Sequence, residues 1–325
     1  MEHMLSTEQI TQQLKFTLAG LDIPEAEGFY SGKVRECYSI KSAISGEKRI
    51  LVATDRLSAF DKILTTIPFK GAILSQMTDY WFKETKNIVP NHVIEVPHPN
   101  VFICEEVDII PVEVVVRGYL TGSAWRDYTS GNPISGVTVK PGKKKNEQFS
   151  VPLITPATKA EIGKHDIPIS GRELVSQGVV EQKVWSEVTE KALALFDFGT
   201  KRAAERGLVL VDTKYEFGLR RGTREVILAD EIHTQDSSRY WVLESYKSRQ
   251  DAGEEPDMLD KEFVRRWLIE RDFMGEGEAP EMTDEFRVET AQRYIQAYEK
   301  ITGLTFQQPV GSQVEQITEV VKSYF

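Results

Sequence analysis

Three charged residues stand at alternate positions in an otherwise apolar stretch at residues 208–218. They are Asp212, Lys214 and Glu216, and the four residues before them, Leu-Val-Leu-Val, are typical of a β-strand. Because the side chains of a strand alternate between its two faces, we expect all three charges on one face. Carboxylates beside an ammonium group make a poor core but a suitable site for a magnesium-bound nucleotide.

A second apolar run, at residues 225–231, is expected to return as the other arm of a hairpin. If Leu219 pairs with Glu225, Asp230 lies opposite Lys214 and joins the charged face. A slip of one residue would turn Asp230 to the other face. The hairpin register therefore decides whether the charged face includes this second carboxylate.

A glycine and two basic residues open the first predicted hairpin, in the tetrapeptide Gly32, Lys33, Val34 and Arg35. Glycine lets backbone N–H groups approach phosphate oxygens. Lys33 and Arg35, two positions apart in a strand, can reach the same face. An exposed basic strand edge would give the same pattern, so the tetrapeptide alone leaves both interpretations open.

A dense set of polar residues follows the predicted strand at residues 49–54. It contains Asp55, Arg56, Ser58 and Asp61. This density of donors and acceptors suits the recognition of a polar substrate. The alternative is a simple helix cap, with Asp55 or Ser58 at a helix start.

Two segments combine an arginine with hydroxyl groups. Arg117 is followed by two glycines and Ser123, which makes a plausible anion cradle, although a glycine turn with Arg117 in a structural ion pair would look alike. Ser238 and Arg239 suit a phosphate monoester held by a forked guanidinium contact. A type I turn explains the preceding Asp-Ser-Ser sequence, but not its position just after Asp230.

Another lysine, Lys159, stands among hydroxyl groups in an expected proline-bounded loop at residues 155–161. This setting favours a functional role over a place on a helix face. His165 follows, and a lone histidine of this kind is more often a capping or solvent-facing residue than a catalyst.

Composition and charge restrict the function classes. With 40% hydrophobic and 28% charged residues, the 325-residue chain is ordinary for a globular protein of about two domains. The net charge of −10 argues against a general nucleic-acid binder, which needs clustered cations. Cys37 and Cys104 have no paired spacing, so we expect two reduced, packed thiols. Since no apolar run reaches roughly 20 residues and no signal-peptide pattern occurs, we expect a cytoplasmic protein without a membrane partner.

The order of periodic segments predicts a β-rich front part, a mixed middle part and a helical tail. Strands are expected at residues 34–38 and 49–54, with more short strands at 93–116. Helices are expected at 10–18, after a capping box at Ser6, and at 74–82, 189–206 and three places in the tail, the last after a capping box at Ser312. Residues 140–146 and 251–257 are expected to be loops.

Several common catalytic motifs are absent from the sequence. It has no Walker A loop, no complete dinucleotide fingerprint, no HExxH and no GxSxG. A nucleotide site in this chain therefore requires another architecture.

Taken together and in order, these segments resemble the SAICAR synthetase family, the phosphoribosylaminoimidazole-succinocarboxamide synthases of purine biosynthesis. The blocks that carry the resemblance are SGKVRECY at Ser31, ATDRLSAFD at Ala53, PVEVVVRGYLTGSAW at Pro111, TPATKAEIGKHD at Thr155, LVLVDTKYEFG at Leu208 and LADEIHTQDSSRYW at Leu228. His233 and Gln235 depart from the family pattern, which has an apolar residue and a proline there.

The resemblance implies ATP-dependent joining of carboxyaminoimidazole ribonucleotide to L-aspartate, with release of ADP and phosphate. It implies an α+β, SAICAR synthase-like fold related to ATP-grasp enzymes, with two lobes and a helical C-terminal segment. The expected domains are a β-rich nucleotide-binding lobe at 1–110, a mixed α/β catalytic lobe at 111–250, and a helical segment at 251–325 that packs on the catalytic lobe. The implied partners are the three small-molecule substrates, and the oligomer is left open as monomer or homodimer.

The resemblance also implies roles for single residues. The ATP phosphates are assigned to Gly32, Lys33, Val34 and Arg35, and the nucleotide and Mg²⁺ to Glu216 and Asp230. Catalysis is assigned to Lys159, Lys214, Glu216 and Asp230. Substrate binding is assigned to Asp55, Arg56, Ser58, Asp61, Arg117, Ser123, Asp212, Ser238 and Arg239.

Two rival functions follow from the same features. The first is another ATP-dependent carboxylate–amine ligase or a small-molecule kinase on the same scaffold, which need not retain both phosphate-binding segments. The second is a non-catalytic nucleotide sensor, which could bind without a full set of magnesium-binding charges.

Overall fold

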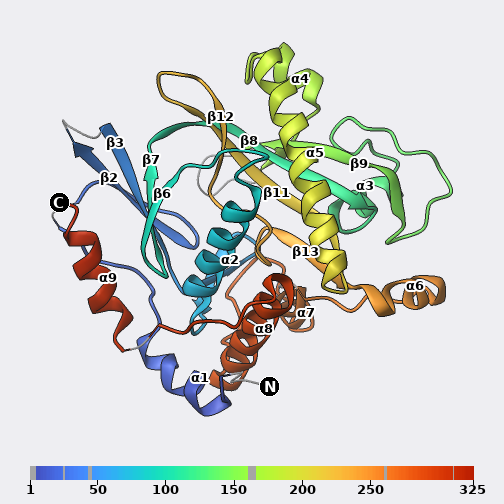
Figure 1. Ribbon diagram of the computed structural model, residues 1–325. Helices are drawn as coiled ribbons and strands as arrows, with labels where there is room; N and C mark the ends of the chain where they lie inside the picture. The colour runs from blue at the N-terminus through green and yellow to red at the C-terminus, as the bar shows by residue number, and fades with distance from the viewer. Residues whose placement is uncertain (1–4, 25, 43–45, 160–165, 260–261, 310) are drawn as a thin grey trace. The chain divides into compact units, whose positions relative to one another are not determined.

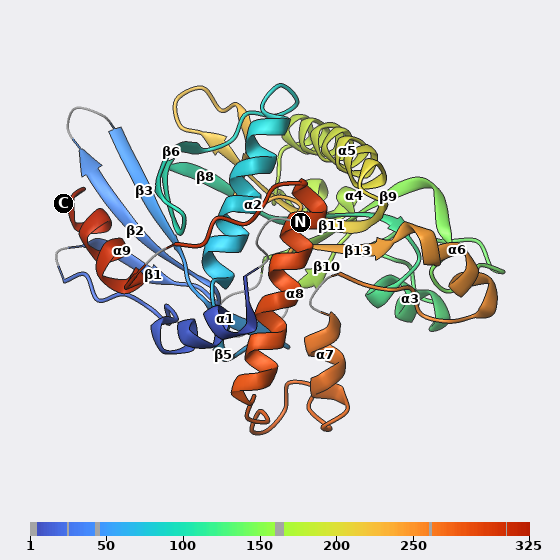
Figure 2. The same cartoon turned by 60° about the horizontal axis from the view of Figure 1, so that its bottom comes forward.

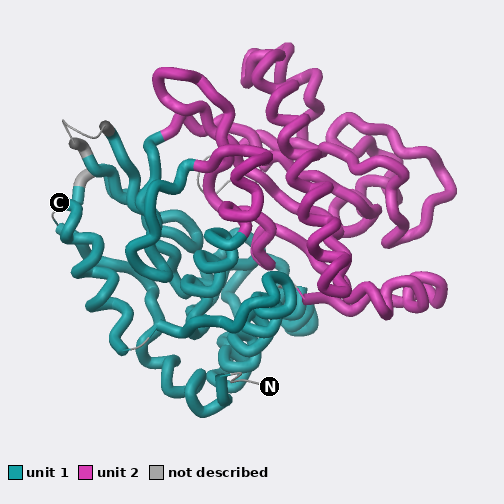
Figure 3. The backbone as a smooth tube through the Cα atoms, in the orientation of Figure 1, with its two compact units in different colours: residues 1–80, 92–106, 261–325 teal, residues 81–91, 107–260 magenta. Residues whose placement is uncertain are grey.

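The computed structural model describes residues 5–24, 26–42, 46–159, 166–259, 262–309 and 311–325. The chain divides into two compact units, shown in separate colours in Figure 3. Unit 1 comprises residues 1–80, 92–106 and 261–325, and unit 2 comprises residues 81–91 and 107–260.

The units differ from the predicted domains in two places. The change of unit after Glu106 falls close to the predicted boundary at 110, but residues 81–91 belong to unit 2, so helix α2 (Lys70–Thr85) crosses the division. The C-terminal segment, expected to pack on residues 111–250, groups with the N-terminal residues from Lys261 onward. The reason is the apolar stripe of helix α9 (Gln313–Lys322), which is buried in the core of unit 1.

Unit 1 is built on a five-stranded antiparallel sheet with the strand order β1-β2-β3-β7-β6. The strands are β1 (Glu27–Ser31), β2 (Arg35–Ser42), β3 (Gly46–Ala53), β6 (Val93–His98) and β7 (Val101–Glu105), and a separate hairpin joins β4 (Arg56–Ala59) to β5 (Lys62–Thr66). The helices are α1 (Thr7–Gln13), a 3₁₀ turn at Leu14–Phe16, α7 (Glu262–Ile269), α8 (Asp284–Thr302) and α9. Figure 2 shows α1 beside α8, to which it is joined by a hydrogen bond between Gln292 and Thr7.

The two faces of this sheet follow from alternation along β3. Ile50 and Val52 face a cluster that includes Ile317 and Val321 of α9, so the tail helix covers one face of the sheet. Leu51 points the other way and packs with Phe102 and the two cysteines. Both cysteines are free thiols, as predicted.

The two predicted capping boxes have different outcomes. At α1, the Ser6 side chain accepts from the N–H of Gln9, whose side chain accepts from the N–H of Ser6, so this box is confirmed. The helix ends earlier than predicted, at Gln13. At α9, Ser312 is the N-cap residue, but its side chain makes no capping hydrogen bond with the described residues, so the second box is wrong.

Unit 2 is built on a second antiparallel sheet with the order β10-β9-β8-β11-β12, and β13 also pairs with β11. The strands are β8 (Val107–Tyr119), β9 (Gln148–Thr158), β10 (Ile167–Pro168), β11 (Leu208–Arg220), β12 (Val226–Ala229) and β13 (Ser238–Val242). The helices are α3 (Gly122–Thr129), α4 (Gly171–Ser176), α5 (Gln182–Glu205) and α6 (Leu243–Ala252). In Figure 1, α5 lies along this sheet, where it contacts β8 and β11.

The middle of the chain confirms one helix and corrects one loop. Helix α5 contains the predicted helix at 189–206 almost entirely. The predicted loop at 155–161 is wrong at its start, because residues up to Thr158 continue strand β9. His165 lies outside the described residues. In the part of the chain that the structure describes, no helix has both the length and the apolar character needed to cross a membrane.

Helix α5 approaches the loop after β12 closely at Gly199. The ring of His233 is fully buried there, packs edge-on against Trp81 with centroids 4.7 Å apart, and shares a 2.6 Å hydrogen bond with Tyr215. Burial lowers the pKa of His233 to about 3, so the imidazole is neutral. The departure from the family pattern at position 233 is therefore a packed core residue.

We expect Gly199→Ala to lower the free energy of unfolding by about 1–3 kcal/mol. A Cβ at position 199 would lie 2.3 Å from Cε1 of His233. Helix propensity alone gives the opposite sign, because Ala is more favourable than Gly by about 1 kcal/mol inside a helix. Denaturant unfolding of Gly199→Ala in the native and His233→Ala backgrounds checks this. A gain of stability in the native background would contradict the close approach.

Candidate active site

The hairpin of β11 and β12 differs from the predicted register by one residue. Leu219 pairs with Val226, and Glu216 pairs with Ala229. The prediction that Leu219 pairs with Glu225 was therefore wrong. In a continuous strand this slip would turn Asp230 away from the charged face.

This does not apply to Asp230, because the strand ends just before it. Strand β12 ends at Ala229, and Asp230 has a φ of 65°, in the left-handed region that few non-glycine residues adopt. Its carboxylate is one of the negative charges that raise the pKa of Lys214. The charge of Asp230 thus acts on Lys214 of the charged face, as predicted. Its position comes from a local change of backbone conformation and not from the pairing of the strands.

Lys214 is the centre of this charged face. Its Nζ lies 2.5 Å from Oε1 of Glu113 on β8 and 3.5 Å from Oε1 of Glu216 on its own strand. Lys159, at the end of β9, forms a close ion pair with the other oxygen of Glu216. Three neighbouring strands therefore bring two lysines and two glutamates together, and Asp230 adds a further negative charge.

The protonation state of Lys214 limits its chemistry. Burial alone would lower its pKa, but the charges of Glu216, Glu113 and Asp230 outweigh burial and raise it above the ordinary value. The side chain is therefore an ammonium ion at neutral pH and cannot serve as a general base. It can neutralise an anionic oxygen.

A second group of charges begins two residues earlier on the same strand. Oδ2 of Asp212 accepts from Nη1 of Arg239 at 2.5 Å and from Nη1 of Arg117 at 3.3 Å. Nη2 of Arg117 donates to Oγ of Ser123 at 3.1 Å, and its Nε donates to Oγ1 of Thr155 at 2.9 Å. The structural ion pair considered for Arg117 is present, and Asp212 accepts from two guanidinium groups.

The structure gives a reason for Gly122, one of the two glycines that follow Arg117. Its φ of 58° is left-handed, and a Cβ would lie 2.7 Å from Nη2 of Arg239. The glycine thus lets the guanidinium group lie against the start of α3. Ser238 instead shares a 2.7 Å hydrogen bond with Thr213, its pairing partner, so its hydroxyl joins β13 to β11.

In unit 1, residues 32–34 connect β1 to β2, and together with Arg35, the first residue of β2, we call them the 32–35 turn. The N–H of Gly32 donates to the carbonyl of Arg35 at 2.8 Å, which closes the predicted hairpin. Lys33 lies in the turn and not in the strand, contrary to the expected alternation with Arg35. Its Nζ forms a close, exposed ion pair with Asp61 at the tip of the β4–β5 hairpin.

No helix starts at Asp55 or Ser58, because Arg56–Ala59 form strand β4, so the cap alternative was wrong; the contacts of Asp55 are nevertheless structural. Its carboxylate is buried and accepts from the N–H of Leu18 at 2.8 Å and from the N–H of Gly71, in the first turn of α2, at 2.9 Å. Burial raises its pKa to about 6, although both hydrogen bonds oppose the shift. Arg56 and Ser58 are also buried, so most of this predicted substrate wall makes contacts inside unit 1.

Two residues of these networks were not predicted from the sequence. Glu113 pairs with Lys214, and the available signal was a single acidic residue inside the apolar run of β8. Glu36 pairs with Arg56 at 2.9 Å with both side chains buried. Nothing local marks Glu36, because its partner lies on a different strand.

The carboxylates of unit 2 suit a metal ion that a nucleotide helps to hold. Among the described residues, no group of three or more His, Cys, Asp and Glu side chains is placed to bind a metal by itself. Mg²⁺ usually binds one or two carboxylates together with substrate phosphates and water. The resemblance assigns Glu216 and Asp230 to a set of this size.

Comparisons with known proteins give the family of the chain. The family profile described as SAICAR synthetase matches residues 28–281. A putative phosphoribosylaminoimidazole-succinocarboxamide synthase 2 of Mesorhizobium japonicum is 49% identical over 296 residues, 89% of this chain and 93% of that protein. A phosphoribosylaminoimidazole-succinocarboxamide synthase of Legionella pneumophila is 47% identical over 283 residues, 85% of this chain and 88% of that protein.

Solved structures show the same similarity. A SAICAR synthase from Saccharomyces cerevisiae, complexed with SAICAR, has a TM-score of 0.78 and 32% identity over 90% of this chain and 100% of that chain. A SAICAR synthetase in complex with ADP has a TM-score of 0.64 and 25% identity over 86% of this chain and 100% of that chain. With the family profile covering most of the sequence and close relatives along nearly its whole length, the chain belongs to the SAICAR synthetase family.

Proposed function

We propose that the chain joins the carboxylate of carboxyaminoimidazole ribonucleotide to the amine of L-aspartate through an acyl-phosphate intermediate. Family membership carries the ATP-dependent ligase activity. The observation that supports the finer mechanism is the arrangement along β11. Asp212, with its two arginines, stands two residues before Lys214 and its carboxylates, so an anion-binding group adjoins an acid-and-lysine group.

The acyl phosphate follows from the chemistry of the substrates. A carboxylate does not react with an amine at neutral pH, because the leaving group would be oxide. A carboxylate oxygen instead attacks the γ-phosphorus, and the bond to the β-phosphate breaks with its electron pair going to ADP. The aspartate nitrogen then attacks the acyl carbon, the carbon–oxygen bond breaks to release phosphate, and the nitrogen loses a proton to water or a nearby carboxylate.

The side chains of unit 2 can offset the charge of these anions. Arg117, Ser123 and Arg239 would hold the phosphate of the ribonucleotide by charge-assisted hydrogen bonds. Lys214 and Lys159 would neutralise oxygens of the transferring phosphoryl group, a stabilisation that is preorganised by their ion pairs. Glu216 and Asp230 would hold Mg²⁺, which supplies positive charge to the triphosphate when bound.

Residues of unit 1 also have proposed roles. The 32–35 turn would bind the ATP phosphates, and Asp61 with Ser58 would contribute to substrate binding. Asp55 and Arg56 are placed in the same wall by the resemblance, although their contacts lie inside unit 1. Cytoplasmic location, a two-lobe arrangement and a relationship to ATP-grasp folds would follow from the family resemblance.

Oxygen transfer tests the acyl phosphate directly. With ¹⁸O in the carboxylate of the ribonucleotide, the attacking oxygen becomes the bridging oxygen of the acyl phosphate and leaves with the phosphorus. We therefore expect one ¹⁸O atom in each phosphate released, measured by mass spectrometry. Unlabelled phosphate together with labelled product would contradict this path.

Arg239→Ala is expected to raise the KM for the ribonucleotide by about tenfold or more, because it removes one charge-assisted contact to its phosphate. The KM values for ATP and aspartate should remain close to those of the native protein. Steady-state kinetics with each substrate varied in turn measures the three values. An unaltered affinity for the ribonucleotide would contradict the assigned phosphate contact.

A further inference from the structure

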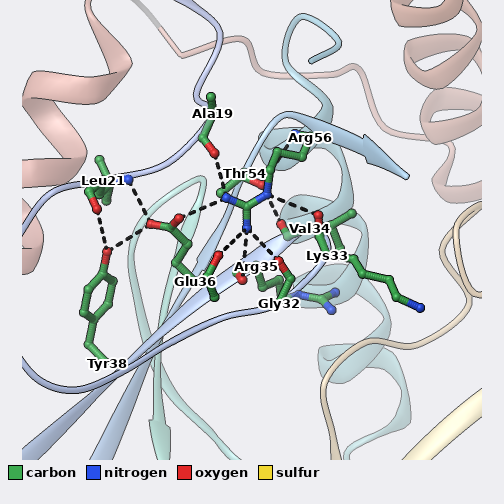
Figure 4. A network of polar contacts seen from close by, with 11 residues as sticks. Ala19, Leu21, Gly32, Lys33, Val34, Arg35, Glu36, Tyr38, Thr54 and Arg56 are labelled. Carbon is green, nitrogen blue, oxygen red and sulfur yellow. Dashed lines mark hydrogen bonds and ion pairs between the residues drawn. The ribbon is translucent and has the colours of Figure 1, made fainter. Parts of the chain in front are cut away.

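Arg56 is buried in unit 1, and its guanidinium group ends among the carbonyl oxygens of the 32–35 turn (Figure 4). Its Nε donates to the carbonyl of Lys33 at 3.1 Å. Its Nη2 donates to the carbonyls of Gly32 at 3.0 Å and Arg35 at 3.3 Å. One side chain therefore holds three of the four carbonyl groups of the turn.

The other side of the guanidinium group is fixed to the body of unit 1. Its Nη1 donates to the carbonyl of Ala19 at 2.6 Å and pairs with Oε1 of Glu36 at 2.9 Å. Glu36 in turn accepts from the N–H of Leu21 at 2.8 Å and from the hydroxyl of Tyr38 at 3.0 Å. The position of the guanidinium group is thus determined by a buried network that does not include the turn.

The fourth carbonyl of the turn is held in the same way. The N–H and the hydroxyl of Thr54 both donate to the carbonyl of Val34, at 2.9 Å and 2.8 Å. In a trans peptide unit, the C=O of one residue and the N–H of the next point in opposite directions. Holding the carbonyls of Gly32 and Lys33 on Arg56 therefore directs the N–H groups of Lys33 and Val34 away from the network.

These two N–H groups are the donors that an anion needs. Within the described residues, neither N–H donates a hydrogen bond to another part of the chain. Lys33 is exposed and Val34 is half-buried, so the turn is accessible. Successive backbone N–H groups that point to the same side form an anion-binding site.

We propose that Arg56 is a positioning residue for nucleotide binding: it fixes the peptide orientation of the 32–35 turn so that the N–H groups of Lys33 and Val34 are ready for ATP phosphates. This rests on the proposed role of the turn in binding ATP. Arg56 then acts without contacting a substrate, in place of the direct contact that the resemblance assigns to it. Without Arg56, the peptide groups can rotate, and a carbonyl oxygen turned outward would repel the phosphate.

Arg56→Lys tests the proposal, because lysine keeps the charge beside Glu36 but has too few N–H groups for all the carbonyls that Arg56 serves. We expect the dissociation constant for ADP, measured by isothermal titration calorimetry, to rise about tenfold or more. Adenosine has no phosphate, so its affinity should not change. Equal weakening of ADP and adenosine would indicate a general loss of structure and would overturn the proposal.

Tyr38→Phe is the matched control, since it removes a hydrogen bond of the same network without touching the turn. It should lower the stability of unit 1 and leave the ADP affinity native. Thr54→Val keeps the shape of a buried residue and removes one of the two donors to the carbonyl of Val34. It should weaken the binding of ADP, by a smaller factor than Arg56→Lys, and leave the binding of adenosine unchanged. It serves as the test if Arg56→Lys does not fold: the Val34 peptide belongs to the same turn, so a native ADP affinity in it would overturn the claim that the peptide orientation of the turn sets the affinity for ADP.

Lys33→Met separates phosphate binding by the turn from positioning by Arg56, because it removes a side chain of the turn without disturbing the network. If Lys33→Met weakens the binding of ADP and Arg56→Lys does not, the turn binds phosphate but Arg56 does not position the turn. If both variants bind ADP like the native protein, the role of the turn in nucleotide binding is wrong. The expected result is weaker binding of ADP in both variants, with the affinity for adenosine unchanged.

Discussion

Asp230→Asn is expected to abolish the release of ADP that depends on the ribonucleotide and aspartate. The change removes a proposed Mg²⁺ ligand and one of the negative charges around Lys214. Loss of a single preorganised charge contact in an active site typically costs about 10²–10³ in kcat, and loss of a metal ligand adds to this. Coupled detection of ADP with all substrates present measures the effect.

The substitution is well suited to separate catalysis from folding. Asn has the shape of Asp and adopts the left-handed backbone conformation of position 230, where φ is 65°, at least as readily. Asp108→Asn is the control, because Asp108 is an exposed carboxylate at the start of β8, where it forms an ion pair with Arg221. It should turn over at the native rate. Unchanged turnover in Asp230→Asn would remove this residue from the active site.

Lys214→Met is expected to lower kcat by about 10²–10³, because it removes the ammonium ion assigned to the transferring phosphoryl group. It also leaves Glu113 and Glu216 close together without the cation between them. Breaking a fully buried ion pair costs about 3–5 kcal/mol of stability, and the half-buried side chains of this pair make the expected loss smaller. Steady-state kinetics and thermal unfolding of the variant measure the two effects.

Lys214→Arg distinguishes the two effects, since it restores a positive charge between the carboxylates but places a wider group there. We expect recovery of most of the stability and only part of the turnover. Lys201→Met removes a lysine from an exposed ion pair on α5 and should change neither. Native kcat in folded Lys214→Met would show that the ammonium ion is not used in the reaction.

The alternation of charges along β11 could be predicted from the sequence, because the period of a strand is a local property. The pairing register could not, since it depends on the turn at residues 221–225 and differs by one residue from the simplest hairpin. The sequence also gives no warning that Asp230 leaves the strand in a left-handed conformation. The correct expectation for Asp230 and the wrong register thus have separate physical origins.

Long-range partners account for the other differences. A buried arginine or aspartate next to a strand looks like a ligand-binding residue until its partners are known, as with Arg56 and Asp55. Glu113 was missed because its partner Lys214 is far along the chain. The tail helix α9 shows its apolar stripe in the sequence, but the stripe does not identify the sheet that it covers.

The most direct test of the central claim is the measurement of ADP release with each substrate omitted in turn. If the chain forms an acyl phosphate and then joins it to aspartate, ADP and a succinocarboxamide product should appear in equal amounts when ATP, the ribonucleotide and aspartate are all present. Omission of the ribonucleotide should abolish ADP release. ADP release that continues at the full rate without the ribonucleotide, or that yields no product with all three substrates, would contradict the account.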